Sequence, residues 1–168
     1  MKLVCKTERL VIRQLTLKDA GFVIRLYNDE SFIRNIADKN IRTIEDAENY
    51  LTNGPLASYQ TYGFGLNLVS LRKSGTLVGI CGVLKRPELD SPDLGYAFLP
   101  EYCNQGYATE ASIGVLQHAV ETLSLNTVLA VTFPNNKGSN RVLTKVGFEL
   151  KGTIALYGLT NNLYEYCA

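Results

Sequence analysis

The chain contains 168 residues, of which 46% are apolar and 20% are charged. A chain of this length and composition can bury a core without disulfide or metal staples, so we predict a single domain over residues 1–168. Lysine and arginine (17) nearly balance aspartate and glutamate (16), which gives a formal net charge of +1. This balance excludes binding to nucleic acid or to a membrane through bulk positive charge, but it leaves room for a local basic site for a phosphorylated ligand.

The cysteines follow neither a metal-binding nor a disulfide pattern. No two of them form a C-x-x-C pair, and the single histidine, His118, lies far from any of them in the sequence. We therefore expect no bound metal and mostly buried, reduced thiols in a cytoplasmic protein. The first residues lack the apolar stretch of a signal peptide, which agrees with that location. The four cysteines are Cys5, Cys81, Cys103 and Cys167.

The first third of the chain predicts one strand and two helices. Leu10-Val11-Ile12 has the apolar, β-branched character of a strand. Thr16-Leu17-Lys18-Asp19 and Thr43-Ile44-Glu45-Asp46 each place an acid three residues after a threonine. This spacing is typical of a capped helix start. Asn53-Gly54-Pro55 predicts the end of the second helix.

The middle of the chain predicts strands followed by a helix. Residues 63–71 and 76–84 read as the two strands of a hairpin around Lys73-Ser74-Gly75. Residues 94–99 form a further strand, which Pro100 closes. Residues 106–123 carry apolar side chains at helical spacing, with a stripe wide enough to pack on a sheet.

The last third of the chain predicts a strand, a short helix and two final strands. Residues 127–133 predict a strand, and Pro134-Asn135-Asn136 opens a short helix that ends at Gly147. Residues 148–156 and 163–166 predict the final strands. This order predicts a mixed α/β (α+β) fold, in which helices cover both faces of one mostly antiparallel sheet of about six to seven strands.

The most informative segment joins the strand at 94–99 to the long helix. The first turn of a helix carries unpaired N–H groups and a partial positive charge, and small residues at Gly106 and Ala108 let a ligand approach that backbone. Together these features suit a pyrophosphate. A plain tight turn is the alternative interpretation, and the more frequent one for such a pattern. The segment is neither a Walker loop nor a G-x-G-x-x-G fingerprint.

Two blocks of sequence extend this pattern. The first comprises Leu94-Gly95-Tyr96, Leu99-Pro100 and Gln105-Gly106-Tyr107-Ala108-Thr109-Glu110-Ala111, and the second is Asn136-x-x-Ser139-x-x-x-Leu143-x-Lys145-x-Gly147-Phe148. In this order they resemble the GNAT superfamily of N-acetyltransferases. The opening Thr7-Glu8-Arg9-Leu10 with Ile12-Arg13 is similar to its Rim-type (RimJ/RimL-like) branch, which includes the N-terminal acetyltransferases of ribosomal proteins.

The resemblance implies acetyl-CoA as the co-substrate. It places the pantetheine arm between two parallel strands that splay apart, around Tyr96–Leu99 and Val128–Phe133, where main-chain groups near Phe98 and Leu99 pair with the amides and the thioester. It assigns the pyrophosphate to the backbone N–H groups of Cys103, Asn104, Gln105, Gly106, Tyr107, Ala108 and Thr109. Cys103 departs from the pattern, since the Rim-type branch commonly has Trp there and the wider superfamily has Arg or Gln. Because the implied pyrophosphate contacts are mainly with the backbone, we expect binding to survive this change.

The resemblance also implies roles in acetyl transfer. Asn136 and Ser139 match the positions that border the thiol end of the cofactor, and Ser139 becomes the predicted general acid. Asp93, directly before Leu94-Gly95-Tyr96, is the predicted base. The alternative interpretations are a cap or packing role for Ser139, a helix cap for Asn136 and a solvated loop carboxylate for Asp93. Reserve proton donors are Tyr102, Tyr107 and Tyr157, and weaker base candidates are Glu101 and Glu110.

The resemblance implies an acetyltransferase, and we expect it to act by direct transfer in a ternary complex, with alignment supplying much of the rate and with no metal. The acceptor is an amine, either a peptide N-terminus or a small molecule, and the sequence does not distinguish them. A catalytically silent acyl-CoA-binding module and a nucleotide-binding protein without CoA chemistry are the alternatives. A homodimer through the terminal strands is compatible with the sequence.

Overall fold

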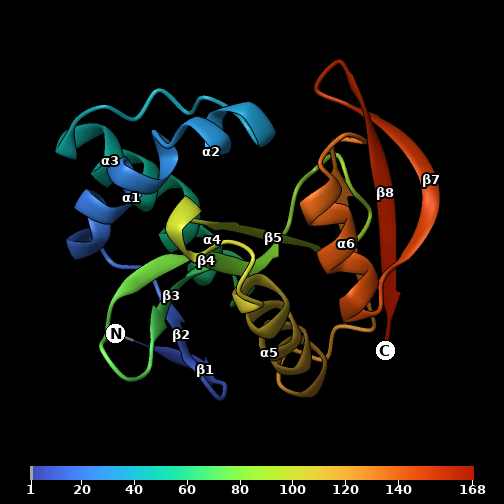
Figure 1. Cartoon of the computed structure of the whole chain (residues 1–168), viewed down its shortest axis with the longest axis horizontal. Coiled ribbons are helices and arrows are strands. Elements are labelled where there is room, and N and C mark those ends of the chain that lie inside the picture. The colour runs from blue at the N-terminus through green and yellow to red at the C-terminus, as the bar shows by residue number, and fades with distance from the viewer. Residues whose placement is uncertain (1) are drawn as a thin grey trace.

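The computed structural model describes residues 2–168; the predicted domain also includes Met1, which lies outside the described residues. An eight-stranded sheet with the order β1-β2-β3-β4-β5-β6-β8-β7 runs through the molecule (Figure 1). The strands are β1 (Leu3–Lys6), β2 (Leu10–Gln14), β3 (Leu66–Leu71), β4 (Leu77–Leu84), β5 (Asp93–Phe98), β6 (Thr127–Thr132), β7 (Glu149–Leu156) and β8 (Leu159–Cys167). The predicted mixed fold is confirmed, with β1 as the strand that the sequence pattern did not reveal.

Helices cover both faces of this sheet (Figure 1). The helical segments are η1 (Leu17–Asp19), α1 (Ala20–Tyr27), α2 (Glu30–Asn35), α3 (Ile44–Leu51), η2 (Thr52–Leu56), α4 (Ala57–Tyr62), η3 (Pro100–Tyr102), α5 (Tyr107–Glu121) and α6 (Lys137–Val146). Across residues 2–168, none of the helices combines the length and the apolar character needed to cross a membrane.

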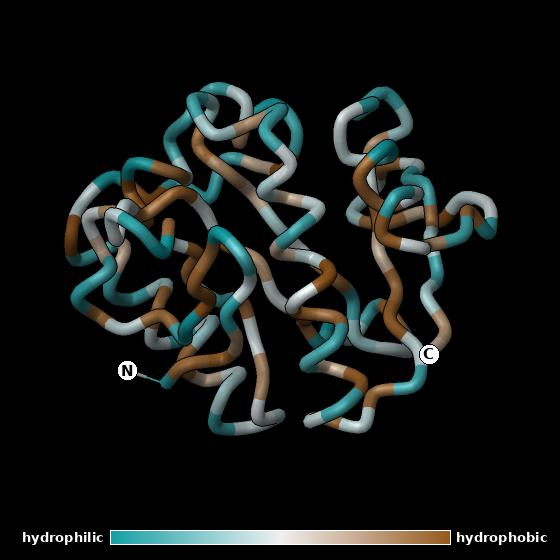
Figure 2. Tube along the Cα trace, turned by 60° about the horizontal axis from the view of Figure 1, so that its bottom comes forward, coloured by the Kyte–Doolittle hydropathy of each residue, from teal (hydrophilic) through white to brown (hydrophobic). Residues whose placement is uncertain are grey.

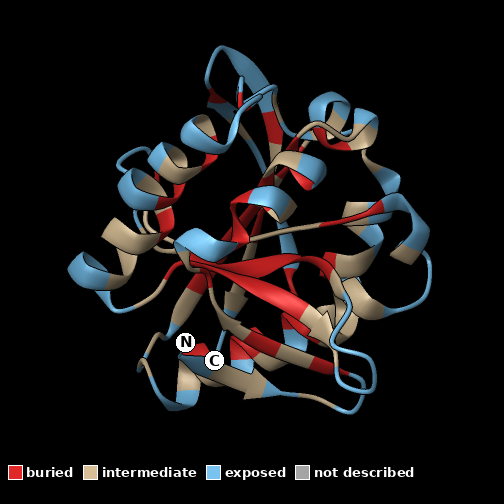
Figure 3. Cartoon of the chain, turned by 90° about the vertical axis from the view of Figure 1, so that its left-hand side faces the viewer, coloured by how far each residue is buried: buried red, intermediate tan, exposed pale blue. Residues whose placement is uncertain are grey.

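Two buried clusters fill the space between the sheet and its helices. On one face, Leu94 and Phe98 of β5 pack in the same cluster as Val115 of α5. On the other face, Leu99 shares a cluster with Leu26 of α1. Figure 3 shows the central strands as buried and the outer sides of the helices as exposed, and Figure 2 shows apolar segments within the molecule and hydrophilic segments in outer loops. Because it is covered from both sides, β5 is a rigid support for whatever binds along its free edge.

The two predicted helix starts are confirmed, and one predicted helix end is wrong. Thr16 and Thr43 each form a capping box with the acid three residues later. The second helix does not stop at Asn53-Gly54-Pro55. It continues through η2, a wide π turn that contains Pro55, into α4, which ends at Gly63 in the left-handed conformation (φ 81°). A widened turn tolerates the missing proline N–H and the bulk of its ring, which would break a regular helix.

The sheet opens between β5 and β6. These two strands form its parallel pair, and their registered contact is Asp93 opposite Leu129. On the outer sides, β4 pairs with β5 as far as Phe98, and β6 pairs with β8 as far as Thr132. The two halves of the sheet therefore stay intact while β5 and β6 diverge toward their carboxyl ends, which confirms the predicted splayed pair.

Candidate active site

The open edge of β5 presents main-chain groups to the gap. Successive N–H groups along a strand point to opposite neighbours. The Leu99 N–H donates to the Val78 carbonyl of β4 at 2.9 Å. By this alternation the main-chain groups of Tyr96 and Phe98 point away from β4, into the gap beside β6. The main-chain groups of Phe98, which were predicted to pair with the cofactor, therefore face the gap. The Leu99 N–H, predicted to do the same, instead donates within the sheet.

The loop from β5 to α5 forms a turn with an uncapped helix start. Asn104 (φ 60°) and Gly106 (φ 84°) both adopt the left-handed conformation, which glycine adopts without strain. Gly106 is the N-cap of α5, and no side chain of residues 2–168 caps this end. The first backbone bond of the helix runs from the Glu110 N–H to the Gly106 carbonyl at 3.0 Å. The N–H groups of residues 107–109 therefore have no partner within the helix, and the seven predicted pyrophosphate residues lie together at this end.

Cys103, where the chain departs from the family pattern, brings no charge to this turn. Its Sγ lies 3.6 Å from the Leu99 carbonyl and 3.8 Å from the Phe98 carbonyl. Partial burial raises the pKa of the Cys103 thiol, and the negative charges of Asp29 and Glu101 act in the same direction. The thiol is therefore held neutral beside the predicted anion site.

A cation reaches the same turn from a distant part of the chain. Arg9, at the turn between β1 and β2, donates through Nε to Glu110 Oε1 at 2.7 Å and through Nη1 to the Gln105 carbonyl at 3.0 Å. Its guanidinium lies 4.3 Å from the centroid of the Tyr107 ring. Thr7 Oγ1 and the Arg9 N–H donate to Glu110 Oε2 at 2.5 and 2.9 Å. Partial burial would raise the pKa of Glu110, but these hydrogen bonds outweigh it and lower the pKa, so the carboxylate is engaged and ionised.

Ser139 meets a second hydroxyl across the gap. Its Oγ lies 2.6 Å from the hydroxyl of Tyr96 on β5, and that hydroxyl also donates to the Ser139 carbonyl at 3.2 Å. Burial raises the pKa of Tyr96 well above its ordinary value, although the bond from Ser139 opposes this shift. Both hydroxyls therefore keep their protons near neutral pH. Tyr96 was predicted to lie on the strand but not to take part in proton transfer, and its position in Leu94-Gly95-Tyr96 was the available signal.

Two asparagines shape the turn from β6 into α6. Asn136 Oδ1 accepts the Ser139 N–H at 3.3 Å, which is the capping geometry. Asn140, which the sequence analysis did not single out, accepts at Oδ1 from Thr132 at 2.5 Å and from Tyr164 at 3.1 Å. Asn140 thereby fixes the first turn of α6 to β6 and β8, and with it the position of Ser139. The signal was its place directly after Ser139.

Asp93 lies at the closed end of the splay. Its side chain has an exposed fraction of 0%, and its two oxygens accept from Arg86 Nε at 3.0 Å and Nη2 at 2.5 Å. Burial raises the pKa of Asp93, and the charge of Arg86 opposes that shift. Asp93 is an odd-numbered residue of β5 and so projects to the face opposite Tyr96. The structure does not bring Asp93 next to Ser139.

Among residues 2–168, no side-chain hydrogen bond joins the remaining candidates to Ser139 or Asp93. Glu101 is exposed and forms an ion pair with Arg25 at 2.7 Å. The Tyr102 ring lies 6.4 Å from the Tyr107 ring, near the helix start. Tyr157 is 67% exposed, at the turn between β7 and β8.

A hollow of about 390 Å³ lies between β1 and α5, lined by residues that include Cys5, Gly114 and His118. It contains Glu110 but none of the residues predicted to hold acetyl-CoA. The hollow is therefore distinct from the open edge of β5.

The chain is similar in sequence and in structure to acetyltransferases. The family model described as "Acetyltransferase (GNAT) domain" matches residues 9–149. The uncharacterized N-acetyltransferase YoaA of Bacillus subtilis (strain 168) is 26% identical over 159 residues, which are 94% of this chain and 89% of YoaA. The crystal structure of a GNAT-family acetyltransferase from Bacillus anthracis superposes with a TM-score of 0.80 at 27% identity, covering 96% of each chain.

A further solved structure shares the fold at low identity. RimL, a ribosomal L7/L12 alpha-N-protein acetyltransferase in complex with coenzyme A, superposes with a TM-score of 0.83 at 14% identity, covering 99% of this chain and 98% of RimL. The splayed sheet, the uncapped helix start and these matches define an acetyltransferase. The chain belongs to the GNAT acetyltransferase family, whose model spans most of its length.

Proposed function

We propose that the protein transfers an acetyl group from acetyl-CoA to a primary amine, by direct transfer in a ternary complex. The observation that carries the proposal is the free edge of β5, which leads directly to the uncapped start of α5. Such an arrangement offers amide-pairing groups and an anion site along one line. The coenzyme A bound to RimL, a protein of the same fold, supports the same cofactor here.

The turn at α5 would hold the pyrophosphate through the backbone N–H groups of residues 103–109, where Gly106 allows close approach. The main-chain groups of Phe98 and Tyr96 at the gap would pair with the pantetheine arm and polarise the thioester carbonyl. Leu99 contributes by anchoring the end of β5 to β4. Asn136 would border the thiol end from the N-cap of α6, where its Oδ1 already accepts the Ser139 N–H.

Ser139 is the proposed general acid, and it works with Tyr96. The 2.6 Å contact between their hydroxyls would let a proton that Ser139 gives to the leaving sulfur be replaced from Tyr96, which would regain its own proton from solvent before the next turnover. Their position on α6 and β5, on either side of the gap, supports a role at the leaving sulfur. A positioned acid typically contributes about 10²–10⁴-fold to a rate.

Asp93 is the proposed base. It projects from the opposite face of β5 to Tyr96, so it would serve an amine that arrives from the other side of the sheet. Both of its oxygens accept from Arg86 and its side chain is fully buried. A proton from the amine would therefore reach Asp93 through a water molecule, and the raised pKa of Asp93 favours that acceptance.

The proposal extends to the branch of the family, the location, the acceptor and the oligomeric state of the protein. The chain would form one acetyltransferase domain of the Rim-type branch, which works in the cytoplasm without a metal. Its acceptor would be a protein N-terminus or a small-molecule amine. The fold shared with RimL, a ribosomal L7/L12 alpha-N-protein acetyltransferase that is 14% identical, supports a protein N-terminus as the acceptor. The edges of the sheet are β1 and β7, so a homodimer would form through one of these strands.

Two measurements on the purified protein test this function. Acetyl-CoA at about 100 times its dissociation constant should stabilise the fold by about 2.7 kcal/mol, which is a rise in Tm of about 5–11 °C for a chain of this size. Thiol release from acetyl-CoA should then depend on an added peptide or amine. Equal stabilisation by ATP or NAD would contradict the cofactor assignment, and binding without thiol release across a broad amine panel would favour a silent acyl-CoA-binding module.

A further inference from the structure

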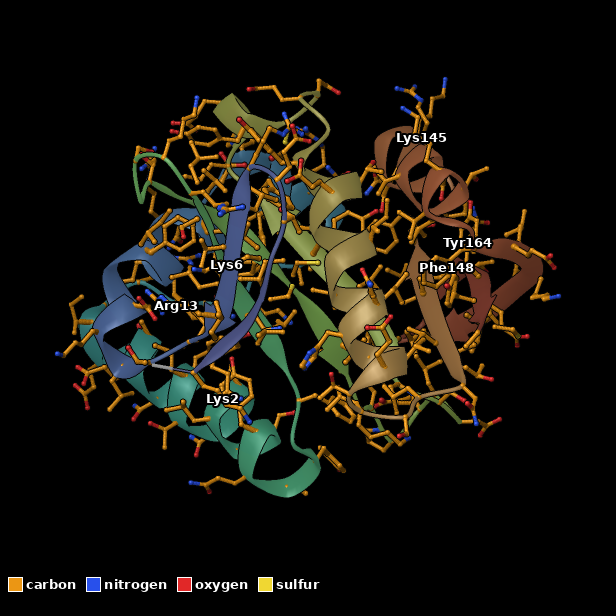
Figure 4. All side chains as sticks on the ribbon, turned by 90° about the horizontal axis from the view of Figure 1, so that it is seen from below. Lys2, Lys6, Arg13, Lys145, Phe148 and Tyr164 are labelled. Carbon is orange, nitrogen blue, oxygen red and sulfur yellow. The ribbon has the colours of Figure 1, made fainter. Side chains whose placement is uncertain are left out.

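The guanidinium of Arg9 contacts the start of α5 from the side of β1. Seen from below, α5 lies between β1, marked by Lys6, and the C-terminal part of the molecule, marked by Phe148 and Tyr164 (Figure 4). Nη1 of Arg9 donates to the Gln105 carbonyl at 3.0 Å, and Nε pairs with Glu110 at 2.7 Å. Two of the guanidinium nitrogens are therefore used within the protein, and the cation is held by an ion pair that spans 101 residues of sequence.

The contact with the Gln105 carbonyl determines where the next N–H group points. The peptide bond between Gln105 and Gly106 is trans. In a trans peptide the C=O and the N–H point in opposite directions across the same plane. Because the Gln105 carbonyl is directed at Arg9, the Gly106 N–H is directed away from Arg9. An anion that accepts from the Gly106 N–H would therefore lie on the side of the turn away from Arg9.

The space beside Gly106 suits glycine and not a residue with a side chain. A Cβ at this position would lie 3.3 Å from Nη2 of Arg9, tighter than ordinary van der Waals contact. The φ of 84° is also a conformation that other residues rarely adopt. Arg9 and Gly106 are thus packed against each other, and the Tyr107 ring lies 4.3 Å from the guanidinium. The orientation of the peptide plane depends on this packing.

We propose that Arg9 is a positioning residue for pyrophosphate binding: it holds the Gln105–Gly106 peptide so that the Gly106 N–H faces the phosphates. The proposal rests on the proposed function, because it takes acetyl-CoA as the ligand of this turn. It also explains how the turn stays ordered with Cys103 at a position where the family commonly has a larger side chain. Glu110, in turn, holds the guanidinium in place through Nε.

The test compares three ligands on the Arg9→Gln variant by equilibrium binding. Coenzyme A carries the pyrophosphate and the 3′-phosphate, dephospho-coenzyme A keeps the pyrophosphate, and pantetheine has neither. Loss of a hydrogen bond to a charged group predicts about ten- to a hundredfold weaker binding of the first two ligands. Pantetheine binding should stay within about twofold of the wild type, since the gap beside β5 is unchanged.

Arg72→Gln is the matched control. Arg72 Nη1 donates to the Thr7 carbonyl at 2.8 Å, so it stabilises the same turn between β1 and β2 through a contact that does not involve Gln105. Its three affinities should match those of the wild type. Arg9→Lys retains the charge but not the planar fork, so we expect it to bind coenzyme A at least about tenfold more weakly than Arg9 does.

The outcomes separate the alternatives. Equal weakening of all three ligands by Arg9→Gln would show a general structural role, and full affinity in Arg9→Lys would show that charge alone matters. Weakening of coenzyme A without weakening of dephospho-coenzyme A would show a direct contact with the 3′-phosphate. Each of these results overturns the positioning role. A wild-type protein that binds none of the three ligands would instead overturn the proposed function.

Discussion

Replacing Ser139 by alanine removes one hydroxyl from the gap, but the Tyr96 hydroxyl keeps a hydrogen-bond acceptor. The Tyr96 hydroxyl can still donate to the main-chain carbonyl of residue 139, at 3.2 Å. The loss is therefore one net hydrogen bond, about 0.5–1.5 kcal/mol of unfolding free energy. For a chain of this size, that is a fall in Tm of about 1–6 °C.

The expected effect on catalysis is larger. Loss of a general acid lowers kcat by about 10²–10⁴-fold, which corresponds to about 2.7–5.5 kcal/mol of activation free energy. The KM for acetyl-CoA should change little, since the main-chain groups of β5 and the turn at α5 are untouched. The assay is thiol release with both substrates near saturation, with melting followed in parallel.

Two further variants sharpen this experiment. Tyr96→Phe removes the partner hydroxyl. If the pair acts as a unit, the double variant should be little slower than Ser139→Ala alone. Ser112→Ala is the control, because Ser112 is buried on α5 beside Cys81, outside the gap, and its loss should affect stability without affecting kcat. An unchanged kcat in Ser139→Ala at saturating substrate would refute the proton-donor role.

Two other predictions follow from the structure. Gly106→Ala should weaken coenzyme A binding by at least about tenfold, since the left-handed φ of 84° costs a side chain about 1–2 kcal/mol and the new Cβ would meet Arg9 at 3.3 Å, so the turn must shift; unchanged affinity by calorimetry would contradict the requirement for glycine at this position. Asp19→Asn should destabilise the protein by about 3 kcal/mol at pH 7, because it breaks a nearly buried pair with Arg13. Burial would raise the pKa of Asp19, but hydrogen bonds from Arg13 and Thr16 lower it, so its contribution is present above the ordinary value of 3.8 and is lost as the pH falls through the lower folded value. Denaturant melts of the variant should therefore show a smaller loss of stability below about pH 4 than the wild type, and parallel pH profiles would argue against this pair.

Local patterns predicted much of the fold. The capping boxes at Thr16 and Thr43 were readable because their partners lie three residues away, within one turn of helix. The predicted helix end at Pro55 was wrong because a widened π turn accommodates the proline, and the chain continues through it into α4. β1 was not recognised because a four-residue strand has too few positions to show an alternating pattern.

The candidate site was predictable where a motif is contiguous and not where its parts come from distant elements. The helix start at Gly106 follows from neighbouring residues. The pairing of Arg9 with Glu110 joins residues 101 positions apart, and Tyr96 meets Ser139 across 43. The burial of Asp93 depends on Arg86, which follows the end of β4, so a loop carboxylate by sequence becomes the centre of a buried ion pair.

Side chains along β5 alternate between the two faces of the sheet, and this places Ser139 and Asp93 on opposite sides of the strand. Leu94, Tyr96 and Phe98 belong to the face that packs with α5, while Ala97 and Leu99 belong to the face that packs with α1. Ser139 contacts Tyr96 on the first face, and Asp93 projects toward the second. In direct transfer, the amine attacks and the thiolate departs at one carbonyl, so the group that accepts a proton and the group that donates one serve different partners. If transfer is direct, as proposed, the hydroxyls on one face of β5 and the carboxylate on the other would serve the sulfur and the amine from separate sides, which is compatible with a ternary complex.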